Sequence, residues 1–216
     1  MHQAIYIIMI GSLGFFTGAC TASTDPEFPP ANQDYSPPQE EEIPGDGYSF
    51  LALGDSYTIG ESVEPRERFP EQLVRQLKSE AIEVGSPVIV AQTGWTTQDL
   101  QRGINSRNLA DRYDLVTLLI GVNNQYQGRS ATEYREEFTT LLKKAIDFAG
   151  TEKRVIVISI PDYGVTPYGK NLNPGKIAKE IDHFNQINLE ATREAVAHNV
   201  DITPISRRAD DDPDLV

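Results

Sequence analysis

Three short polar segments carry residue types that could do chemistry, and each directly follows an apolar run. The segments hold Ser56, Gly94 and Asn123. A serine hydroxyl is a poor nucleophile until it is positioned and deprotonated, and its attack on an acyl group places negative charge on an oxygen that needs preorganised donors. A glycine lets the backbone approach that oxygen closely, and an asparagine amide donates without carrying charge. The three residues therefore form a coherent set for acyl transfer.

Each of these residues also has a purely structural interpretation. A Gly-Asp-Ser turn commonly precedes a helix, Gly94 could supply a positive φ angle, and Asn123 could close a turn. No single motif of this length is specific for catalysis. The order of the three segments and their placement after successive apolar runs favour the catalytic interpretation.

The apolar runs predict the elements that would position these residues. They are continuous, as in strands covered on both faces, and they alternate with helical patterns, which is typical of βα units. We expect an α/β fold, a three-layer α/β/α sandwich with a mostly parallel five-stranded sheet. In such a sheet ligands bind outside the carboxyl ends of the strands, where the polar segments lie. The expected strands span residues 48–53, 88–91, 115–120, 155–160 and, more weakly, 200–205.

Several helix ends are marked by residues with a known preference for them. Pro70 suits the first turn of one helix, and Ser130 with Glu133 forms a capping box before another. Gly150 is placed to end that second helix. Asn173 followed by proline opens a further amphipathic helix.

The three segments lie in blocks that resemble those of the SGNH hydrolases, the GDSL-type serine esterases and lipases. FLALGDSYTIGE resembles the nucleophile block, AQTGWTT the glycine block and LLIGVNNQYQG the asparagine block, over roughly residues 50–216. The resemblance implies the flavodoxin-like fold of that family and ester hydrolysis through an acyl-serine intermediate, without a cofactor. It also implies that Ser56 is the nucleophile. The oxyanion would be held by the backbone N–H groups of Ser56 and Gly94 and by the Asn123 side-chain amide.

The general base of that family, a histidine in an Asp-x-x-His block near the C-terminus, is missing from this sequence. The three histidines are His2, His183 and His198. The first lies in the predicted N-terminal signal and the other two in or near an amphipathic helix, so we expect them to be structural or solvated. We therefore expect a weak or inactive catalyst. The chain is either a fragment of a complete hydrolase, which we favour, or a natural short form with a vestigial site.

The N-terminal region predicts export. An apolar run at 4–16 is too short to span a bilayer as a stable helix, and the segment Thr17-Gly18-Ala19-Cys20 resembles a bacterial lipoprotein signal. Cys20 is the only cysteine, and lipidation would account for it. We expect a signal at 1–20, a disordered acidic proline-rich linker at 21–47 and a hydrolase domain at 48–216, incomplete at its C-terminus. The protein would be periplasmic or at the cell surface.

The charge and composition limit the partners. A formal net charge of -13 argues against nucleic acid and against anionic membrane surfaces. Contact with a membrane would come only through a lipid anchor at Cys20. The sequence shows no cluster of His, Cys and carboxylate residues with the spacing of metal ligands, so no metal is implied.

The expected substrate is a small-molecule, lipid or glycan ester. The alternative function is a surface binding protein that holds an acylated lipid or glycan in a vestigial site without cleaving it. Four aromatic residues near the strand ends could line an acyl or sugar pocket, and could equally be ordinary packing. They are Tyr57, Trp95, Tyr126 and Tyr163.

Overall fold

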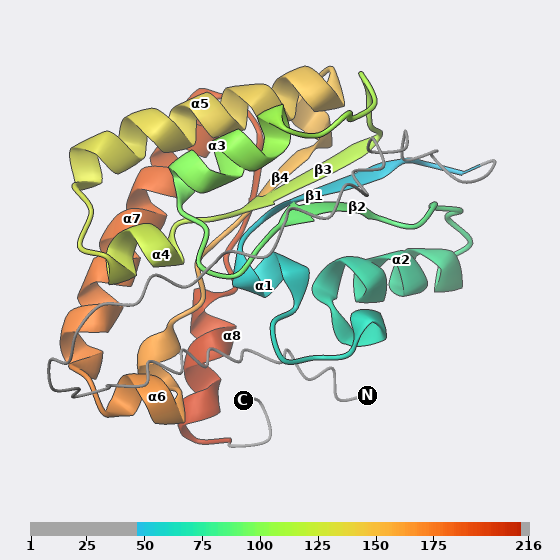
Figure 1. The fold of residues 1–216 in the computed structure, drawn as a ribbon. Coiled ribbons are helices and arrows are strands. Elements are labelled where there is room, and N and C mark those ends of the chain that lie inside the picture. Colours follow the sequence, from blue (N-terminus) through green and yellow to red (C-terminus); the bar gives the residue numbers. More distant parts are fainter. Residues whose placement is uncertain (1–46, 213–216) are drawn as a thin grey trace, which may run out of the picture.

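The computed structural model of the chain describes residues 47–212 (Figure 1). The predicted signal at 1–20, Cys20 within it, and the predicted linker at 21–47 except its last residue lie outside the described residues. Within the described part, no helix is both long enough and apolar enough to span a membrane.

The centre of the fold is one five-stranded sheet in the order β2-β1-β3-β4-β5, with every pairing parallel. This confirms the predicted α/β class, and the strand order is the flavodoxin-like one. The predicted strand at 88–91 is confirmed to the residue. The runs at 115–120 and 155–160 extend one and two residues past their strands, and the run at 48–53 begins two residues before its strand and ends one residue before it does. The strands are β1 (Phe50–Gly54), β2 (Val88–Ala91), β3 (Leu115–Leu119), β4 (Val155–Ile158) and β5 (His198–Val200).

The prediction of a strand at 200–205 is wrong for all but its first residue. Strand β5 ends at Val200, and the helix α8 (Thr203–Arg207) follows. The backbone leaves the sheet because the Ser159 hydroxyl accepts the N–H groups of Ile202 and Thr203, at 2.8 and 3.2 Å. Pro204 then lies in the first turn of α8, where its missing N–H costs nothing.

Helices cover both faces of the sheet and form the predicted three layers (Figure 1). Helices α3 (Thr97–Asn105), α5 (Ala131–Ala149) and α7 (Pro174–Glu194) pack on one face, and α2 (Phe69–Ser79) packs on the other. Successive side chains of a strand point to opposite faces. Leu51 and Leu53 therefore join the core under α5, while Phe50 and Ala52 pack against α2.

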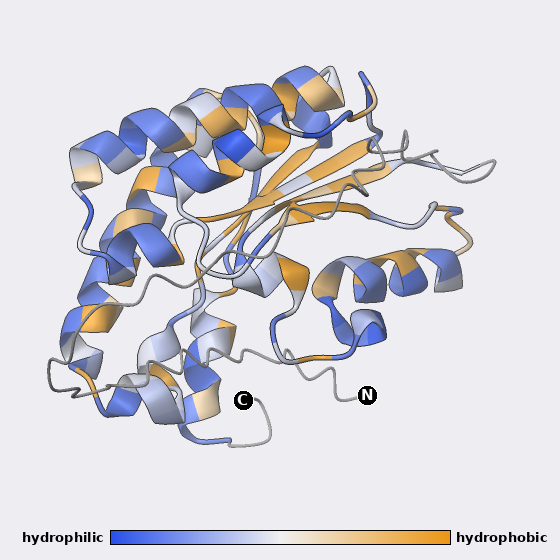
Figure 2. Cartoon of the chain, viewed as in Figure 1, coloured by the Kyte–Doolittle hydropathy of each residue, from blue (hydrophilic) through white to orange (hydrophobic). Residues whose placement is uncertain are grey.

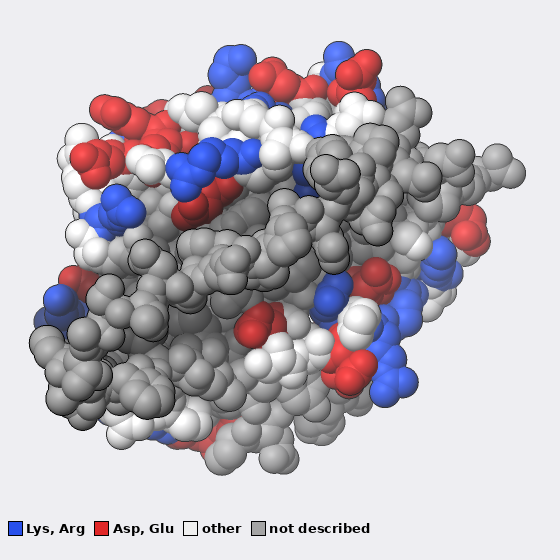
Figure 3. All heavy atoms as spheres, viewed as in Figure 1, with Lys and Arg blue, Asp and Glu red and all other residues white. Residues whose placement is uncertain are grey.

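The distribution of hydropathy follows these layers. Figure 2 shows hydrophobic strands enclosed by helices whose outer faces are hydrophilic. Acidic and basic side chains are interspersed along the upper edge of the view in Figure 3, over α3 and α5.

The residues expected to begin and end helices do so. Pro70 lies in the first turn of α2, and Ser130 caps α5 by accepting the N–H of Glu133. Gly150 ends α5 in the left-handed conformation with a φ of 72°, and Asn173 caps α7. The remaining short elements are α1 (Ser56–Ile59), η1 (Pro65–Glu67), α4 (Val122–Tyr126), η2 (Glu152–Arg154), η3 (Tyr163–Val165), α6 (Pro167–Lys170) and η4 (Arg208–Asp210).

Candidate active site

The ends of three neighbouring strands are level with one another. Gly54, the last residue of β1, pairs with Ala91 on one side and with Leu119 on the other. Adjacent strands lie about 4.8 Å apart. The loops that follow β1, β2 and β3 therefore start side by side, and they carry Ser56, Gly94 and Asn123 respectively.

Ser56 is the first residue of the short helix α1 and is 3% exposed. Its Oγ has no hydrogen-bond partner among the described residues. The turn into α1 needs the glycine before it, because a Cβ at Gly54 would lie 2.5 Å from the Leu119 carbonyl oxygen and closer still to the Thr58 hydroxyl. The local sequence thus places an unpaired serine hydroxyl at the carboxyl edge of the sheet.

Gly94 and Asn123 lie in two loops that are tied together. Gly94 has a φ of 82° and a hypothetical Cβ would meet nothing within 4 Å, so the backbone conformation alone favours glycine here. Asn123 is 7% exposed, and its Nδ2 donates to the carbonyl of Trp95, the residue after Gly94, at 2.9 Å. An amide nitrogen has two hydrogens, so one hydrogen of Asn123 is left for a ligand.

Asn124 fixes the helix α4, a role that sequence reasoning missed. Its Oδ1 accepts the backbone N–H of Thr97 at 3.0 Å, and its Nδ2 donates to the Thr97 hydroxyl at 2.7 Å. Both residues are buried. This two-way contact holds α4, and with it Asn123, against the start of α3. The only sequence signal for this role is that a second asparagine directly follows Asn123.

Asp55 directly precedes Ser56 and is completely buried. Its Oδ1 accepts the N–H of Tyr57 at 3.1 Å, and its Oδ2 has no hydrogen-bond partner among the described residues. Burial raises the pKa of Asp55 to about 7, although hydrogen bonding by the neighbouring backbone lowers it. The sequence marked this aspartate only as part of a turn.

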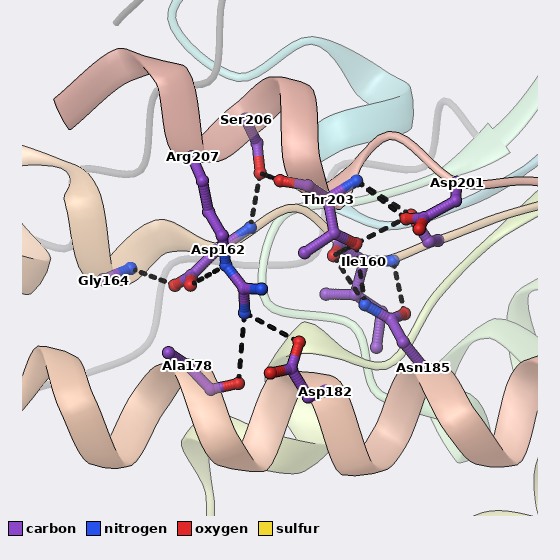
Figure 4. Close-up of polar contacts among 11 residues, drawn as sticks. Ile160, Asp162, Gly164, Ala178, Asp182, Asn185, Asp201, Thr203, Ser206 and Arg207 are labelled. Atoms are coloured by element: carbon purple, nitrogen blue, oxygen red, sulfur yellow. Dashed lines mark hydrogen bonds and ion pairs between the residues drawn. The ribbon is translucent and has the colours of Figure 1, made fainter. Parts of the chain in front are cut away.

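Asp162, which lies in the loop after β4 and caps η3, anchors α8 (Figure 4). The carboxylate is 2% exposed and accepts from the backbone of Gly164 and from Arg207 Nε, both at 2.8 Å. The Ser206 hydroxyl accepts the Asp162 N–H at 2.9 Å. Arg207 also donates to Asp182 on α7 at 2.7 Å. Helix α8 is thereby tied to the loop after β4 and to α7.

Replacing Arg207 with methionine should lower the free energy of unfolding by roughly 3 kcal/mol, because it leaves the buried Asp162 carboxylate without its cation. The measurement is urea unfolding of the two proteins at neutral pH. The matched control is Arg208→Met, since Arg208 is exposed at the next position and should change stability by no more than about 0.5 kcal/mol. Equal unfolding midpoints for the two variants would show that the Asp162 contact does not anchor α8.

Neither described histidine forms a hydrogen bond with the Ser56 hydroxyl. His183 is exposed on α7. His198 is exposed on β5 and pairs with Ile156 of β4, two residues before the carboxyl ends of these strands. Strand β5 is three strands from β1, about 14 Å at the usual spacing. Residues 47–212 also contain no group of three or more His, Cys, Asp or Glu side chains that could hold a metal ion.

Comparisons with known proteins identify the family and the fold. The GDSL-like Lipase/Acylhydrolase family matches residues 52–216. No curated protein matches significantly. Among solved structures, AlinE4, an SGNH-hydrolase family esterase, is 23% identical with a TM-score of 0.62 over 80% of this chain and 84% of that chain. A lipase/acylhydrolase from Enterococcus faecalis is 21% identical, with a TM-score of 0.57 over 73% and 77%.

The acetylxylan esterase Axe2 from Geobacillus stearothermophilus is similar to the same degree, at 17% identity and a TM-score of 0.57 over 76% of this chain and 80% of that one. At these identities the structures show a shared fold. The family match extends over most of the chain and includes all three loops at the sheet edge. The chain therefore belongs to the GDSL-like lipase/acylhydrolase family of ester hydrolases, the SGNH hydrolases.

Proposed function

We propose that this chain cleaves carboxylic esters through an acyl-serine intermediate formed on Ser56. The observation that carries the proposal is the buried, unpaired Ser56 hydroxyl at the sheet edge that it shares with Asn123. Ser56 Oγ attacks the carbonyl carbon and gives up its proton to a base. The tetrahedral intermediate expels the alcohol, which takes that proton. Water then attacks the acyl group and restores the serine.

The donors for the oxyanion would be the backbone N–H groups of Ser56 and Gly94 and the Asn123 amide. Ser56 is the first residue of α1, so its N–H has no acceptor within the helix. The Gly94 loop is held next to Asn123 by the bond between the Asn123 amide and the Trp95 carbonyl. Donors that are fixed in this way need little reorganisation when charge develops on the substrate.

The 216-residue chain should hydrolyse p-nitrophenyl acetate only slowly, because neither described histidine forms a hydrogen bond with the Ser56 hydroxyl. Loss of a triad member typically leaves an enhancement of about 10³–10⁴ over water, which comes from the oxyanion donors and binding. Turnover near 10 s⁻¹, an ordinary enzyme rate, would contradict the weak-catalyst expectation. The acyl-serine itself is tested by the intact mass of the protein after incubation with the ester, which should show an acetyl group that is absent in Ser56→Ala. An acetyl group that forms equally in Ser56→Ala would overturn the acyl-serine proposal.

We also propose that the protein is exported and lipidated on Cys20, which rests on the sequence of residues 1–20. The intact mass of the protein from its own source tests this. We expect a chain that begins at Cys20 and carries the added mass of its acyl groups. A mature protein that retains Met1, or one with an unmodified Cys20, would contradict the proposal.

A further inference from the structure

A series of hydrogen bonds connects helix α5 to the residue that follows Asn123. It begins at Glu137 on α5, whose Oε2 accepts a hydrogen bond from the hydroxyl of Thr97, the first residue of α3. The Thr97 Oγ in turn accepts from Asn124 Nδ2 at 2.7 Å, and the Asn124 Oδ1 accepts from the Thr97 N–H at 3.0 Å. Glu137 lies 40 residues from Thr97 in the sequence, so only the fold brings these groups together.

The carboxylate gives this series one direction. A carboxylate accepts but cannot donate, so the single hydrogen of the Thr97 hydroxyl points at Glu137 and its lone pairs face Asn124. Hydrogen bonds to a charged group are roughly twice as strong as those between neutral groups, and each bond of a series polarises the next. Thr97 and Asn124 are 1% and 2% exposed, and Glu137 is half-buried. The outer carboxylate therefore strengthens a contact inside the protein.

Helix α4 depends on contacts of this kind. It has five residues, and Gly121 at its N-cap provides no side-chain hydrogen bond. A helix this short is not stable by itself in water. Besides the bonds of Asn124, α4 is held by Gln125, which donates to Glu180 on α7 at 2.8 Å. The direction of the Asn123 amide, which belongs to the same short helix, therefore follows from how its two neighbours are held.

Glu137 reaches α4 from outside the proposed site. Among the described residues, it lines a small polar pocket that includes Asn124 and Arg129 but none of the three candidate catalytic residues. Its second carboxylate oxygen accepts from Gln98 Nε2 at 2.5 Å, so both oxygens bind the start of α3. A group in a separate pocket influences the reaction through the residues that it holds.

We propose that Glu137 is a positioning residue for ester hydrolysis. Through Thr97 and Asn124 it holds α4 in the orientation that aims the free hydrogen of the Asn123 amide at the substrate oxygen. The inference rests on the proposed function, because it takes Asn123 as an oxyanion donor. It adds a residue of α5, outside the loops at the sheet edge, to the groups on which the reaction depends.

The rate at which a fluorophosphonate reacts with Ser56 tests the proposal, when intact mass is followed over a range of probe concentrations. We expect Glu137→Ala to lower the limiting rate about tenfold and to leave the half-saturating probe concentration unchanged. A displacement of about 1 Å can cost 10²-fold, but the contact of Gln125 with Glu180 remains and limits the loss. Glu137→Gln keeps an acceptor for the Thr97 hydroxyl and should retain most of the rate.

The matched control is Glu136→Ala, since Glu136 is exposed at the preceding position of α5 and its substitution should leave the rate unchanged. A double variant, Asn123→Ala with Glu137→Ala, tests the route of the effect. Because Glu137 acts through Asn123, its loss should cause no further decrease once the Asn123 amide is gone. Circular dichroism of each variant confirms that it is folded.

The proposal is overturned if Glu137→Ala reacts as fast as Glu136→Ala, or if Glu137→Gln is as slow as Glu137→Ala. It is also overturned if Glu137→Ala slows the Asn123→Ala protein by the same factor as the wild-type protein. A failure of the proposed function gives a different result. In that case Ser56→Ala would be labelled as well as the wild-type protein, or Asn123→Ala alone would react at the wild-type rate.

Discussion

Replacing Asn123 with alanine will reduce the Ser56-dependent hydrolysis of p-nitrophenyl acetate about 10²- to 10³-fold, which is the usual cost of removing one oxyanion donor. The amide has one hydrogen engaged with the Trp95 carbonyl and a second that is free for the substrate oxygen. Because the slow activity of this chain is expected to rest on the oxyanion donors, the loss should bring it close to the rate of buffer.

One further variant tests whether the N–H groups of the Asn123 side chain are what matters, and a second serves as the matched control. Asn123→Asp keeps the shape of the side chain but removes both N–H donors, so it should lose at least as much activity as Asn123→Ala. Asn108→Ala, at an exposed asparagine in the loop after α3, should keep full activity. If Asn123→Ala stays folded and retains more than half of the rate, Asn123 does not hold the oxyanion.

The second large effect concerns Asp55 and the dependence of stability on pH. Its pKa is raised from 3.8 to about 7, mainly because the carboxyl group is buried. Between these two values the folded state binds more protons than the unfolded state, so this group makes stability fall as the pH rises. The contribution is fully present below pH 3.8 and is lost above about pH 7. Its full size is on the order of 4 kcal/mol.

Asp55→Asn should therefore remove a decline in stability between about pH 4 and pH 7. Urea unfolding of both proteins from pH 4 to pH 8.5 measures it, and the difference between the two curves should favour the variant increasingly up to pH 7. Carboxylates with a lowered pKa, such as Asp99 and Asp114, contribute a slope of opposite sign. They are the same in both proteins and cancel in the difference.

The matched control for Asp55→Asn is Asp111→Asn, because Asp111 is exposed and its substitution should leave the pH dependence unchanged. A difference curve for Asp55→Asn that is flat across the range would mean that the buried carboxyl group does not titrate as described. A curve that favours the wild-type protein as the pH rises would have the wrong sign for a raised pKa.

Much of the fold could be predicted because its signals are local. Continuous apolar runs separated by amphipathic helices specify parallel βα units, and Ser130, Gly150 and Asn173 mark helix ends through contacts within one turn. The strand prediction at 200–205 was wrong because the Ser159 hydroxyl, which is distant in sequence, accepts hydrogen bonds from the backbone N–H groups of Ile202 and Thr203. The apolar residues of the run do not indicate that such a hydrogen bond will form.

Part of the candidate site could also be predicted from the sequence, and part could not. The sequence predicted that Ser56, Gly94 and Asn123 would follow strands and share one edge, and the strand register brings their loops together there. Their catalytic roles stay predictions. The groups that hold the loops could not be foreseen, because Asn124 and Thr97 lie 27 residues apart and form hydrogen bonds only in the folded chain. Likewise, nothing local shows that Asp55 lies at the centre of the fold.

The most direct test of the central claim is to incubate the 216-residue protein exhaustively with a fluorophosphonate and to map the adduct by peptide mass spectrometry. The account predicts one phosphonyl group per chain, located on Ser56, with slow formation and with no adduct in Ser56→Ala. An unmodified Ser56 in folded protein, or an adduct on a different residue, would contradict the claim that Ser56 is the nucleophile of this fold.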